Sequence, residues 1–131
     1  MKAAALSVIC LATLVACAPT DDADGTLAHS QWQFLEIDGS PPPNESATIS
    51  FEAKTINASA GCNTMSGAWR TEGERLIAGP LTQTEIYCEG PRWHQEKALG
   101  ALLAAAPRFA LEGDTLTLQS SGHSAELRRK Y

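Results

Sequence analysis

Short segments that alternate between apolar and polar residues follow one another along most of this chain, with turn residues between them. The clearest is Ala47-Thr48-Ile49-Ser50-Phe51, which places apolar side chains on one face and hydroxyls on the other. Such segments predict strands at residues 32–37, 47–51, 55–60, 67–71, 75–78, 108–111, 115–119 and 124–128. We therefore expect a mainly β (α+β) fold: a small antiparallel curled sheet, or a partly open β-barrel, since closure removes exposed strand edges.

Residues 91–106 form the one stretch with a convincing helical pattern. Pro91 suits the first helical turn, and Pro107 ends the helix. The expected apolar stripe consists of Trp93, Leu99, Leu102 and Leu103. The side expected to face water carries Arg92, Gln95, Glu96 and Lys97. Trp32, Trp69 and Trp93 are all expected in the core, because a tryptophan buries so much area.

The N-terminal residues 1–16 have the pattern of a signal peptide: Lys2 is followed by an apolar run from Ala3 to Ala16. The run is too short to cross a bilayer as a helix, which takes about 20 apolar residues. Leu14-Val15-Ala16-Cys17 resembles the bacterial lipobox. That resemblance implies cleavage before Cys17, a diacylglycerol on its sulfur and an acylated amino terminus. The alternative is an ordinary secretory signal with a chance cysteine.

Sorting and charge bear on where the chain resides. Ala18 is not Asp, which by resemblance to enteric lipoproteins favours the outer membrane, facing the periplasm. The formal net charge is −5, so the chain would repel nucleic acid phosphates and gain nothing from anionic lipid. Membrane attachment is therefore expected through acylated Cys17 alone. Residues 17–29, rich in Asp and poor in apolar residues, are expected to form a flexible tether before one domain at 30–131.

Four cysteines define the crosslinking options. Cys10 leaves with the leader and Cys17 takes the lipid, so Cys62 and Cys88 are expected to pair as a disulfide in an oxidising compartment. Closing a loop of about 25 residues contributes roughly 3 kcal/mol in the chain-entropy model. Two other states stay open at this point. One is free thiols, and the other is zinc bound together with His94 and His123, although these residues lack the tight local spacing of zinc sites.

The segment Gly61 to Trp69 leads us to expect a tight crossing between two strands, because Gly61 and Gly67 tolerate positive φ and Asn63 follows closely. No catalytic group is predicted. Ser66 has no acidic or histidine neighbour and no Gly-x-Ser-x-Gly elbow, so it is expected as a turn hydroxyl. Cys88 could act as a nucleophile with His94 as its base only as a free thiol, so a disulfide at Cys88 rules out this pair. Thr82 and Thr84 are expected to hydrogen-bond to backbone near the disulfide. We predict no metal and no cofactor.

A set of residues spread over positions 30–129 resembles META/HslJ-like domains. Its members are Trp32, Phe34, Asp38-Gly39, Ile49-Ser50-Phe51, Gly61-Cys62-Asn63, Ser66-Gly67-Ala68-Trp69, Gly79-Pro80-Leu81, Thr84, Cys88 and Leu116-Thr117-Leu118. The family motif falls on Gly61, Cys62, Asn63, Gly67, Thr84 and Cys88, while Trp69 stands where many relatives carry Tyr. The resemblance implies a barrel-like fold with one helix and no established catalytic residues. It also implies an envelope lipoprotein linked to heat or antibiotic stress.

The expected function is a non-catalytic, lipid-anchored binding module of the cell envelope, and not an enzyme. Its partner would be an envelope protein or a small hydrophobic ligand. Two alternatives stay open. Ser66-Gly67-Ala68-Trp69 resembles the Ser-Gly-x-Tyr turn of membrane-bound lysozyme inhibitors, which would make the chain a protein inhibitor. Tryptophans lining an open barrel end would instead make it a carrier of a small hydrophobic molecule.

Overall fold

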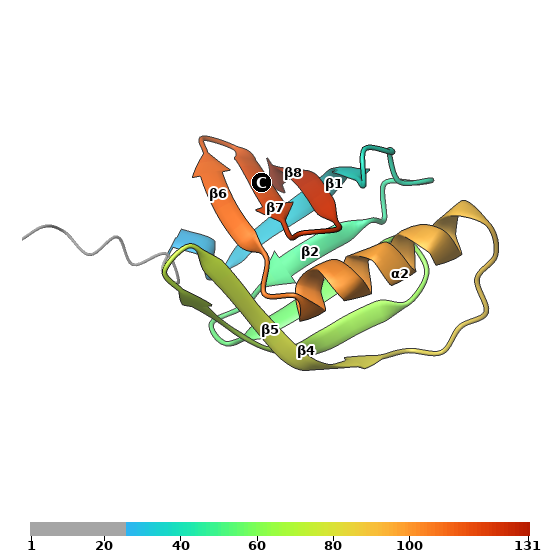
Figure 1. The fold of residues 1–131 in the computed structure, drawn as a ribbon, viewed down its shortest axis with the longest axis horizontal. Coiled ribbons are helices and arrows are strands. Elements are labelled where there is room, and N and C mark those ends of the chain that lie inside the picture. The colour runs from blue at the N-terminus through green and yellow to red at the C-terminus, as the bar shows by residue number, and fades with distance from the viewer. Residues whose placement is uncertain (1–25) are drawn as a thin grey trace, which may run out of the picture.

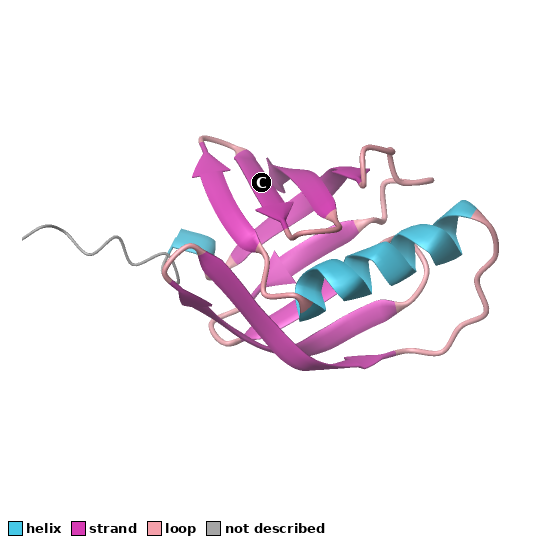
Figure 2. Ribbon diagram, viewed as in Figure 1, coloured by secondary structure: helices cyan, strands magenta, loops and turns pink. Residues whose placement is uncertain are grey.

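The computed structural model describes residues 26–131, which form a closed antiparallel barrel with one long helix (Figures 1 and 2). The strands are β1 (Ser30–Ile37), β2 (Thr48–Phe51), β3 (Thr55–Ser59), β4 (Thr64–Glu72), β5 (Arg75–Gln83), β6 (Arg108–Glu112), β7 (Thr115–Gln119) and β8 (Ser124–Lys130). The helix, α2 (Pro91–Ala104), lies between β5 and β6 in the chain. The predicted mainly β fold with one helix is confirmed.

Each strand pairs with the next along the chain, and β8 returns to β1. The closing pair runs from Gln31 opposite Lys130 to Ile37 opposite Ala125, with a register shift between Phe34 and Glu36. A strand at each edge of an open sheet would expose a row of unpaired N–H and C=O groups, and this closure gives both edge strands a partner. The barrel is thus closed rather than partly open.

Of the neighbouring strands in the barrel, β5 and β6 share the fewest paired residues. Their strand pairing consists of Arg75 opposite Arg108. Beside it, the N–H of Leu76 donates to the Pro107 carbonyl and the N–H of Phe109 donates to the Glu74 carbonyl, both at 2.9 Å. Helix α2 makes its main contacts with β5 and further ones with β1, and in the view of Figure 1 it runs obliquely between β2 and β4.

The core fills the barrel interior. Alternate residues of the strands point inward, as period-2 patterning requires. The largest side chains that are essentially inaccessible to solvent are Trp32, Phe34, Phe51, Leu27, Ile37, Ile49, Ile56, Leu76, Leu99, Leu102, Leu103 and Leu116. Three of them, Leu99, Leu102 and Leu103, come from α2, so the helix completes the same core that the strands begin.

The start of β4 and the end of β5 differ most from the predicted strand boundaries. β4 begins at Thr64, so the expected crossing over residues 61–69 is reduced to a turn before that residue. β5 continues through Gly79-Pro80, where we expected it to stop. The pairing with β4 shifts register there: Gly67 lies opposite Leu81 and Trp69 opposite Ala78, which leaves Gly79-Pro80 against one residue. Proline lacks an N–H, and a bulge is a place where a strand tolerates that loss.

The predicted faces of the helix are partly wrong. Gln95 and Glu96, expected to face water, are buried, whereas Trp93, expected in the core, is 42% exposed. Glu96 precedes Leu99 by three residues and Gln95 precedes it by four, so both share its face. Partners from distant segments meet them there. For Gln95 these are the carbonyls of Ser40 and Pro41, to which Nε2 donates at 3.0 and 3.1 Å. The helix also ends at Ala104 rather than Ala106.

The N-terminal boundary of the folded part lies earlier than the expected end of the tether at His29. Leu27 is fully buried in the core. Ser30 Oγ donates to the Leu27 carbonyl, and Trp32 Nε1 donates to Ser30 Oγ at 2.7 Å. The expected signal peptide and Cys17 lie outside the described residues. Within residues 26–131, no helix has both the length and the apolar character that a membrane crossing requires.

Candidate functional site

Asn63 is the centre of the largest buried polar cluster that we describe, and it is only 4% exposed. Its side chain pairs with the backbone of Ile86 as a second peptide group would. Oδ1 accepts from the Ile86 N–H at 2.6 Å, and Nδ2 donates to the Ile86 carbonyl at 2.9 Å. Oδ1 also accepts from Thr84 Oγ1 at 2.9 Å. One buried amide thus binds the turn before β4 to the segment that follows β5.

Glu96 connects the same turn to α2. It is 5% exposed, and both of its carboxylate oxygens accept from Asn63. The Asn63 backbone N–H donates to Oε1 at 2.7 Å and Nδ2 donates to Oε2 at 3.1 Å. Buried polar groups without hydrogen bonds are costly, so this paired arrangement is what allows a carboxylate to sit in the core-facing side of the helix.

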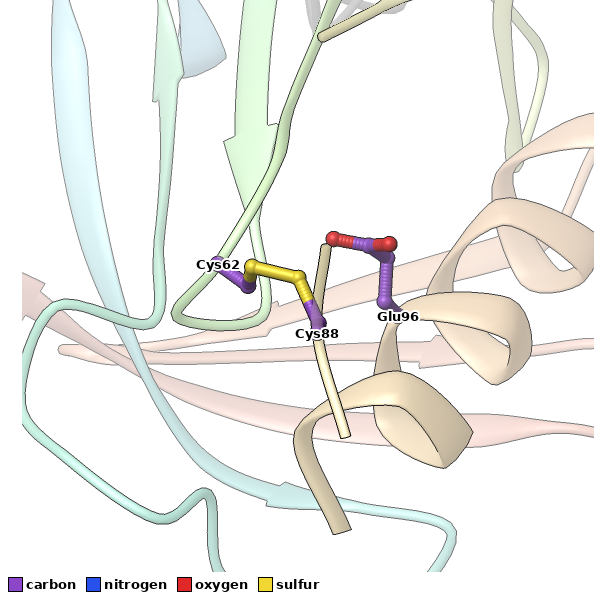
Figure 3. Close-up of side chains that lie close together, drawn as sticks. All are labelled: Cys62, Cys88 and Glu96. Atoms are coloured by element: carbon purple, nitrogen blue, oxygen red, sulfur yellow. A yellow bond between two sulfur atoms is a disulfide. The ribbon is translucent and has the colours of Figure 1, made fainter. Parts of the chain in front are cut away.

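The disulfide joins the same segments covalently (Figure 3). Cys62 and Cys88 are bonded, with their Cα atoms 6.4 Å apart. Asn63 Nδ2 lies 3.4 Å from Cys88 Sγ, and the Glu96 side chain extends towards the sulfurs from the neighbouring turn of α2. The two sulfurs and a Glu96 oxygen all lie within 4.8 Å of one another. The expected pairing of Cys62 with Cys88 is present.

Glycine is required at the two motif positions, Gly61 and Gly67, for different structural reasons. Gly61 has φ +111°, and a Cβ there would lie 3.1 Å from Asn44 Oδ1. It opens the turn that carries Cys62 and Asn63. Gly67 lies away from this cluster, in β4, where a Cβ would meet the Pro80 carbonyl oxygen at 2.5 Å. That distance is too short for any side chain, so Gly67 permits the close approach of β5 at its bulge.

Threonine contacts fix the start of the connection between β5 and α2. Thr84 Oγ1 accepts from the Thr64 N–H at 3.0 Å, and the Thr84 N–H donates to the Thr64 carbonyl at 3.1 Å. Thr82 Oγ1 donates to the Ser66 carbonyl at 3.3 Å. Both threonines therefore bond to backbone near the disulfide, as expected.

Three large apolar side chains gather on the outside of this cluster, and we call them the Cys88 surface: Ile86, Tyr87 and Trp93. They are 62%, 83% and 42% exposed. In residues 26–131 the other exposed large apolar side chain is Tyr131, at the C-terminus. Lys97 Nζ lies 4.0 Å from the centre of the Trp93 ring. Beneath these side chains is a groove of about 370 Å³, which Asn63, Thr84 and Glu96 also line.

The remaining candidates lie elsewhere. Ser66 is in β4 and not in a turn, and its hydroxyl donates to Asn57 Oδ1 at 2.6 Å. His94 is exposed and packs edge-on against Trp93. His123 lies beside Asp38, with 2.8 Å between Nδ1 and Oδ2. Neither histidine belongs to the group of potential metal ligands found in the described residues, which consists of Cys62, Cys88 and Glu96.

Asp38 organises a second, more exposed polar cluster. Its Oδ1 accepts from the Ser124 N–H at 3.0 Å, and its backbone N–H donates to the Ser124 carbonyl at 2.9 Å. Desolvation raises the pKa of the Asp38 carboxyl, but the hydrogen bonds from Ser124 and His123 and the charge of His123 outweigh it. The pKa therefore lies below the ordinary value for aspartate.

Sequence reasoning missed the roles of Glu96 and Ile86. Glu96 had a usable signal, because it shares the helical face of Leu99 and Leu103 at spacings of three and seven residues. A carboxylate on an apolar face predicts a buried partner. Ile86 contributes through its backbone, and nothing in its side chain indicates that role.

The fold and the cluster together define a class: a small closed antiparallel barrel in which one disulfide, one buried asparagine and one helix are joined. A protein-family model described as the META domain matches residues 25–130. The chain therefore belongs to the META domain family. No curated protein sequence matches it.

Solved structures with the same fold share little sequence with the chain. An NMR structure of a protein has a TM-score of 0.69 at 23% identity, covering 80% of this chain and 92% of that one. An NMR structure of a protein from Burkholderia xenovorans has a TM-score of 0.68 at 20% identity, covering 95% and 99%. A crystal structure of a DUF4847 family protein from Bacteroides vulgatus has a TM-score of 0.56 at 14% identity, covering 81% and 96%. At these identities the likeness extends to the fold alone.

Proposed function

We propose that this META domain protein is a non-catalytic binding module, held at the cell envelope by acylated Cys17, that docks an envelope protein through the Cys88 surface. The observation that carries the proposal is that three exposed large apolar side chains border one groove beside the disulfide: Ile86 and Tyr87 from the segment before Cys88, and Trp93 from the first turn of α2. Isolated exposed apolar residues are ordinary on protein surfaces, whereas a contiguous group marks an interaction site.

The segment that presents these side chains is held rigidly. Ile86 is bonded at both its N–H and its carbonyl by Asn63, and Cys88 two residues later is covalently fixed. A loop already fixed in one conformation loses less entropy when it binds, which favours affinity. Tyr and Trp are also the residues that most often dominate binding energy at protein interfaces.

Charge next to the surface indicates the chemistry of the partner. Glu85 and Glu89 flank Ile86 and Tyr87 and are both exposed, and Tyr87 Oη donates to Glu89 Oε1 at 2.9 Å. A complementary partner would offer an apolar pocket bordered by basic side chains. The overall negative charge of the chain favours the same complement.

Two further parts of the proposal are the envelope address, which sequence features support, and a role in tolerance of heat or antibiotic stress, which rests on the resemblance to META/HslJ-like domains alone. The lipobox at Leu14-Val15-Ala16-Cys17 supports lipidation, and Ala18 supports transfer to the outer membrane. Intact-mass analysis of the protein from membranes tests the lipidation. We expect a chain that begins at Cys17 with added acyl mass, and a Cys17→Ser chain that leaves the membrane fraction. An unmodified leader on the membrane-bound chain would contradict the assignment.

Neither alternative gains an observation from the structure. The inhibitor alternative depends on an exposed turn at residues 66–69, but this segment lies in β4 and Trp69 is buried. The carrier alternative depends on an open barrel end lined by tryptophans. Trp32 is instead fully buried among the side chains that fill the interior, and Trp93 lies outside it.

Photo-crosslinking in intact cells tests the docking surface. A photoreactive phenylalanine replaces Tyr87 in the full chain, and the matched control carries it at Glu112, an exposed residue at the end of β6. We expect one adduct of defined mass from position 87 and not from 112, reduced several-fold when Trp93→Ser is added. The adduct protein, purified alone, should bind the wild-type chain and bind Trp93→Ser at least about tenfold more weakly. Equal adducts from both positions, or equal binding of both chains, would overturn the proposal.

A further inference from the structure

We propose that reduction of the Cys62–Cys88 disulfide creates a site for a thiophilic divalent cation, with Zn²⁺ as the best chemical match, formed by the two thiolates and Glu96. This inference does not depend on the proposed docking function. It rests on where a buried carboxylate lies relative to the two sulfurs.

The three potential ligand atoms come from three segments that the fold already holds together. Cys62 lies in the turn before β4, Cys88 in the connection to α2, and Glu96 in the helix. Cys62 Sγ, Cys88 Sγ and a Glu96 oxygen lie within 4.8 Å of one another, and Figure 3 shows the carboxylate directed towards the sulfurs. Zinc bonds of about 2.3 Å to sulfur and 2.0–2.2 Å to oxygen require ligand separations below that limit. Once the disulfide is reduced, rotation of the two cysteine side chains would separate the sulfurs to the roughly 3.8 Å that a tetrahedral ion needs.

Glu96 retains the capacity to bind a cation while it stays bonded to Asn63. An ionised carboxylate has about four lone-pair positions on its two oxygens. The Asn63 N–H and Nδ2 occupy one position on each oxygen. Asn63 would then orient the ligand from behind, which is the role that outer hydrogen-bond partners have at metal sites.

The site would be open on one side. The groove of about 370 Å³ beneath the Cys88 surface is lined by Cys88 and Glu96, so solvent can supply a fourth ligand. Two thiolates and one carboxylate with an open position suit tetrahedral Zn²⁺, because soft sulfur ligands select against Mg²⁺ and Ca²⁺. His94 and His123 are not members of this ligand group.

The chemistry balances with a dithiol reductant. Its two thiols supply two electrons and two protons, the Cys62–Cys88 bond breaks to two thiols, and the reductant leaves as a cyclic disulfide. Zn²⁺ then displaces one proton from each thiol as the metal–sulfur bonds form. Binding therefore releases two protons and tightens as pH rises.

Cobalt titration tests the site, because Co²⁺ in a tetrahedral sulfur site has visible and near-ultraviolet absorption bands. The full chain carries Cys10→Ser and Cys17→Ser, so that Cys62 and Cys88 are its remaining cysteines. A phosphine reduces the disulfide and becomes the phosphine oxide with oxygen from water. We expect one Co²⁺ per reduced chain, with a sulfur-to-cobalt charge-transfer band that Zn²⁺ abolishes, and no band from the oxidised chain.

The variant Glu96→Gln distinguishes a metal site that includes Glu96 from metal binding by the two thiols alone. We expect it to weaken Co²⁺ binding at least about tenfold, whereas Glu89→Gln, an exposed carboxylate next to Cys88, leaves binding unchanged. Zn²⁺ should also raise the melting temperature of the reduced wild type more than that of reduced Glu96→Gln. The absence of a band overturns the proposal, as does equal binding by wild type and Glu96→Gln. A reduced chain that unfolds and is not refolded by Zn²⁺ overturns it as well.

Discussion

Asn63 and Asp38 perform the same task in two different environments. Asn63 directly precedes β4 and Asp38 directly follows β1. Each binds its own turn to a distant segment through its side chain and its backbone N–H. Asn63 is 4% exposed and bonds to Ile86 and Glu96. The Asp38 side chain is 37% exposed and bonds to His123 and Ser124.

This difference in burial predicts that the stability of the fold depends more on the Asn63 cluster than on the Asp38 cluster. A buried group that loses its partner keeps the full cost of desolvation, about 1–3 kcal/mol for each group. An exposed group exchanges its partner for water at little cost. We therefore expect changes around Asn63 to be severe and changes around Asp38 to be mild, although both clusters look complete in the structure.

Asn63→Ala should give the largest loss, about 4 kcal/mol of unfolding free energy, because Glu96 and the Ile86 backbone lose partners together. Urea unfolding of the oxidised protein, followed by tryptophan fluorescence, measures it. Asn57→Ala is the matched control, since Asn57 is a half-buried asparagine whose Oδ1 accepts a single described bond from Ser66. We expect about 1 kcal/mol there. Equal losses in the two variants would remove the special status of Asn63.

Removing the disulfide should cost slightly less. The double variant Cys62→Ser, Cys88→Ser opens a crosslink between residues 26 positions apart, and we expect a loss of about 3 kcal/mol. The same urea experiment applies, and reduced wild type without metal should match the variant. A decrease in unfolding free energy below about 1 kcal/mol would show that the hydrogen bonds of Asn63, and not the disulfide, hold the turn before β4 to the connection after β5.

A pair of glycine substitutions compares the two turns directly. Gly39, next to Asp38, has φ +76° and open space around it, whereas Gly61 has φ +111° and Asn44 nearby. Gly39→Ala should cost about 1 kcal/mol from backbone strain alone, and Gly61→Ala about 2 kcal/mol or more. Thermal unfolding of both variants gives the order. The reverse order would contradict the comparison.

Asp38→Asn should have the smallest effect, below about 1 kcal/mol at neutral pH, because the carboxyl is more than a third exposed. The folded state lowers the pKa of Asp38. Its contribution is therefore fully present above the unfolded value of about 3.9 and is lost as pH falls through the lower folded value. Stability measured from pH 7 down to acid should show the wild type and Asp38→Asn converging. A constant difference would mean that the charge is not involved.

Local signals predicted most of the barrel. The strands at 47–51, 108–111 and 115–119 were predicted from the pattern of residues that are neighbours in sequence, and each is present in the barrel. The Cys62–Cys88 pair followed from elimination, because Cys10 was expected to leave with the leader and Cys17 to carry the lipid. Strand formation depends on the local sequence, and the disulfide followed from the number of cysteines, so neither inference required knowledge of which distant segments meet.

The contents of the site depended on distant segments and were predicted less well. Asn63 was recognised for its turn, but its partners lie 23 and 33 residues away. Helical spacing places Glu96 on the apolar face of α2, but it does not say which segment covers the first turns of the helix, and Glu96 and Trp93 were therefore assigned to the wrong environments. The connection after β5 covers Glu96 and leaves Trp93 outside, and that arrangement is a product of the whole fold.

The positions of two segments in Figure 1 give the molecule a direction. In Figure 1 the N-terminal end of the described chain (blue) lies on the left, and the connection between β5 and α2 lies on the right, at the opposite end of the molecule. A domain fastened to a bilayer from its N-terminal side would hold the β5–α2 connection, which carries Tyr87, at the end away from the bilayer. The body of the barrel would then act as a spacer, extending the reach of Tyr87 away from the lipid headgroups.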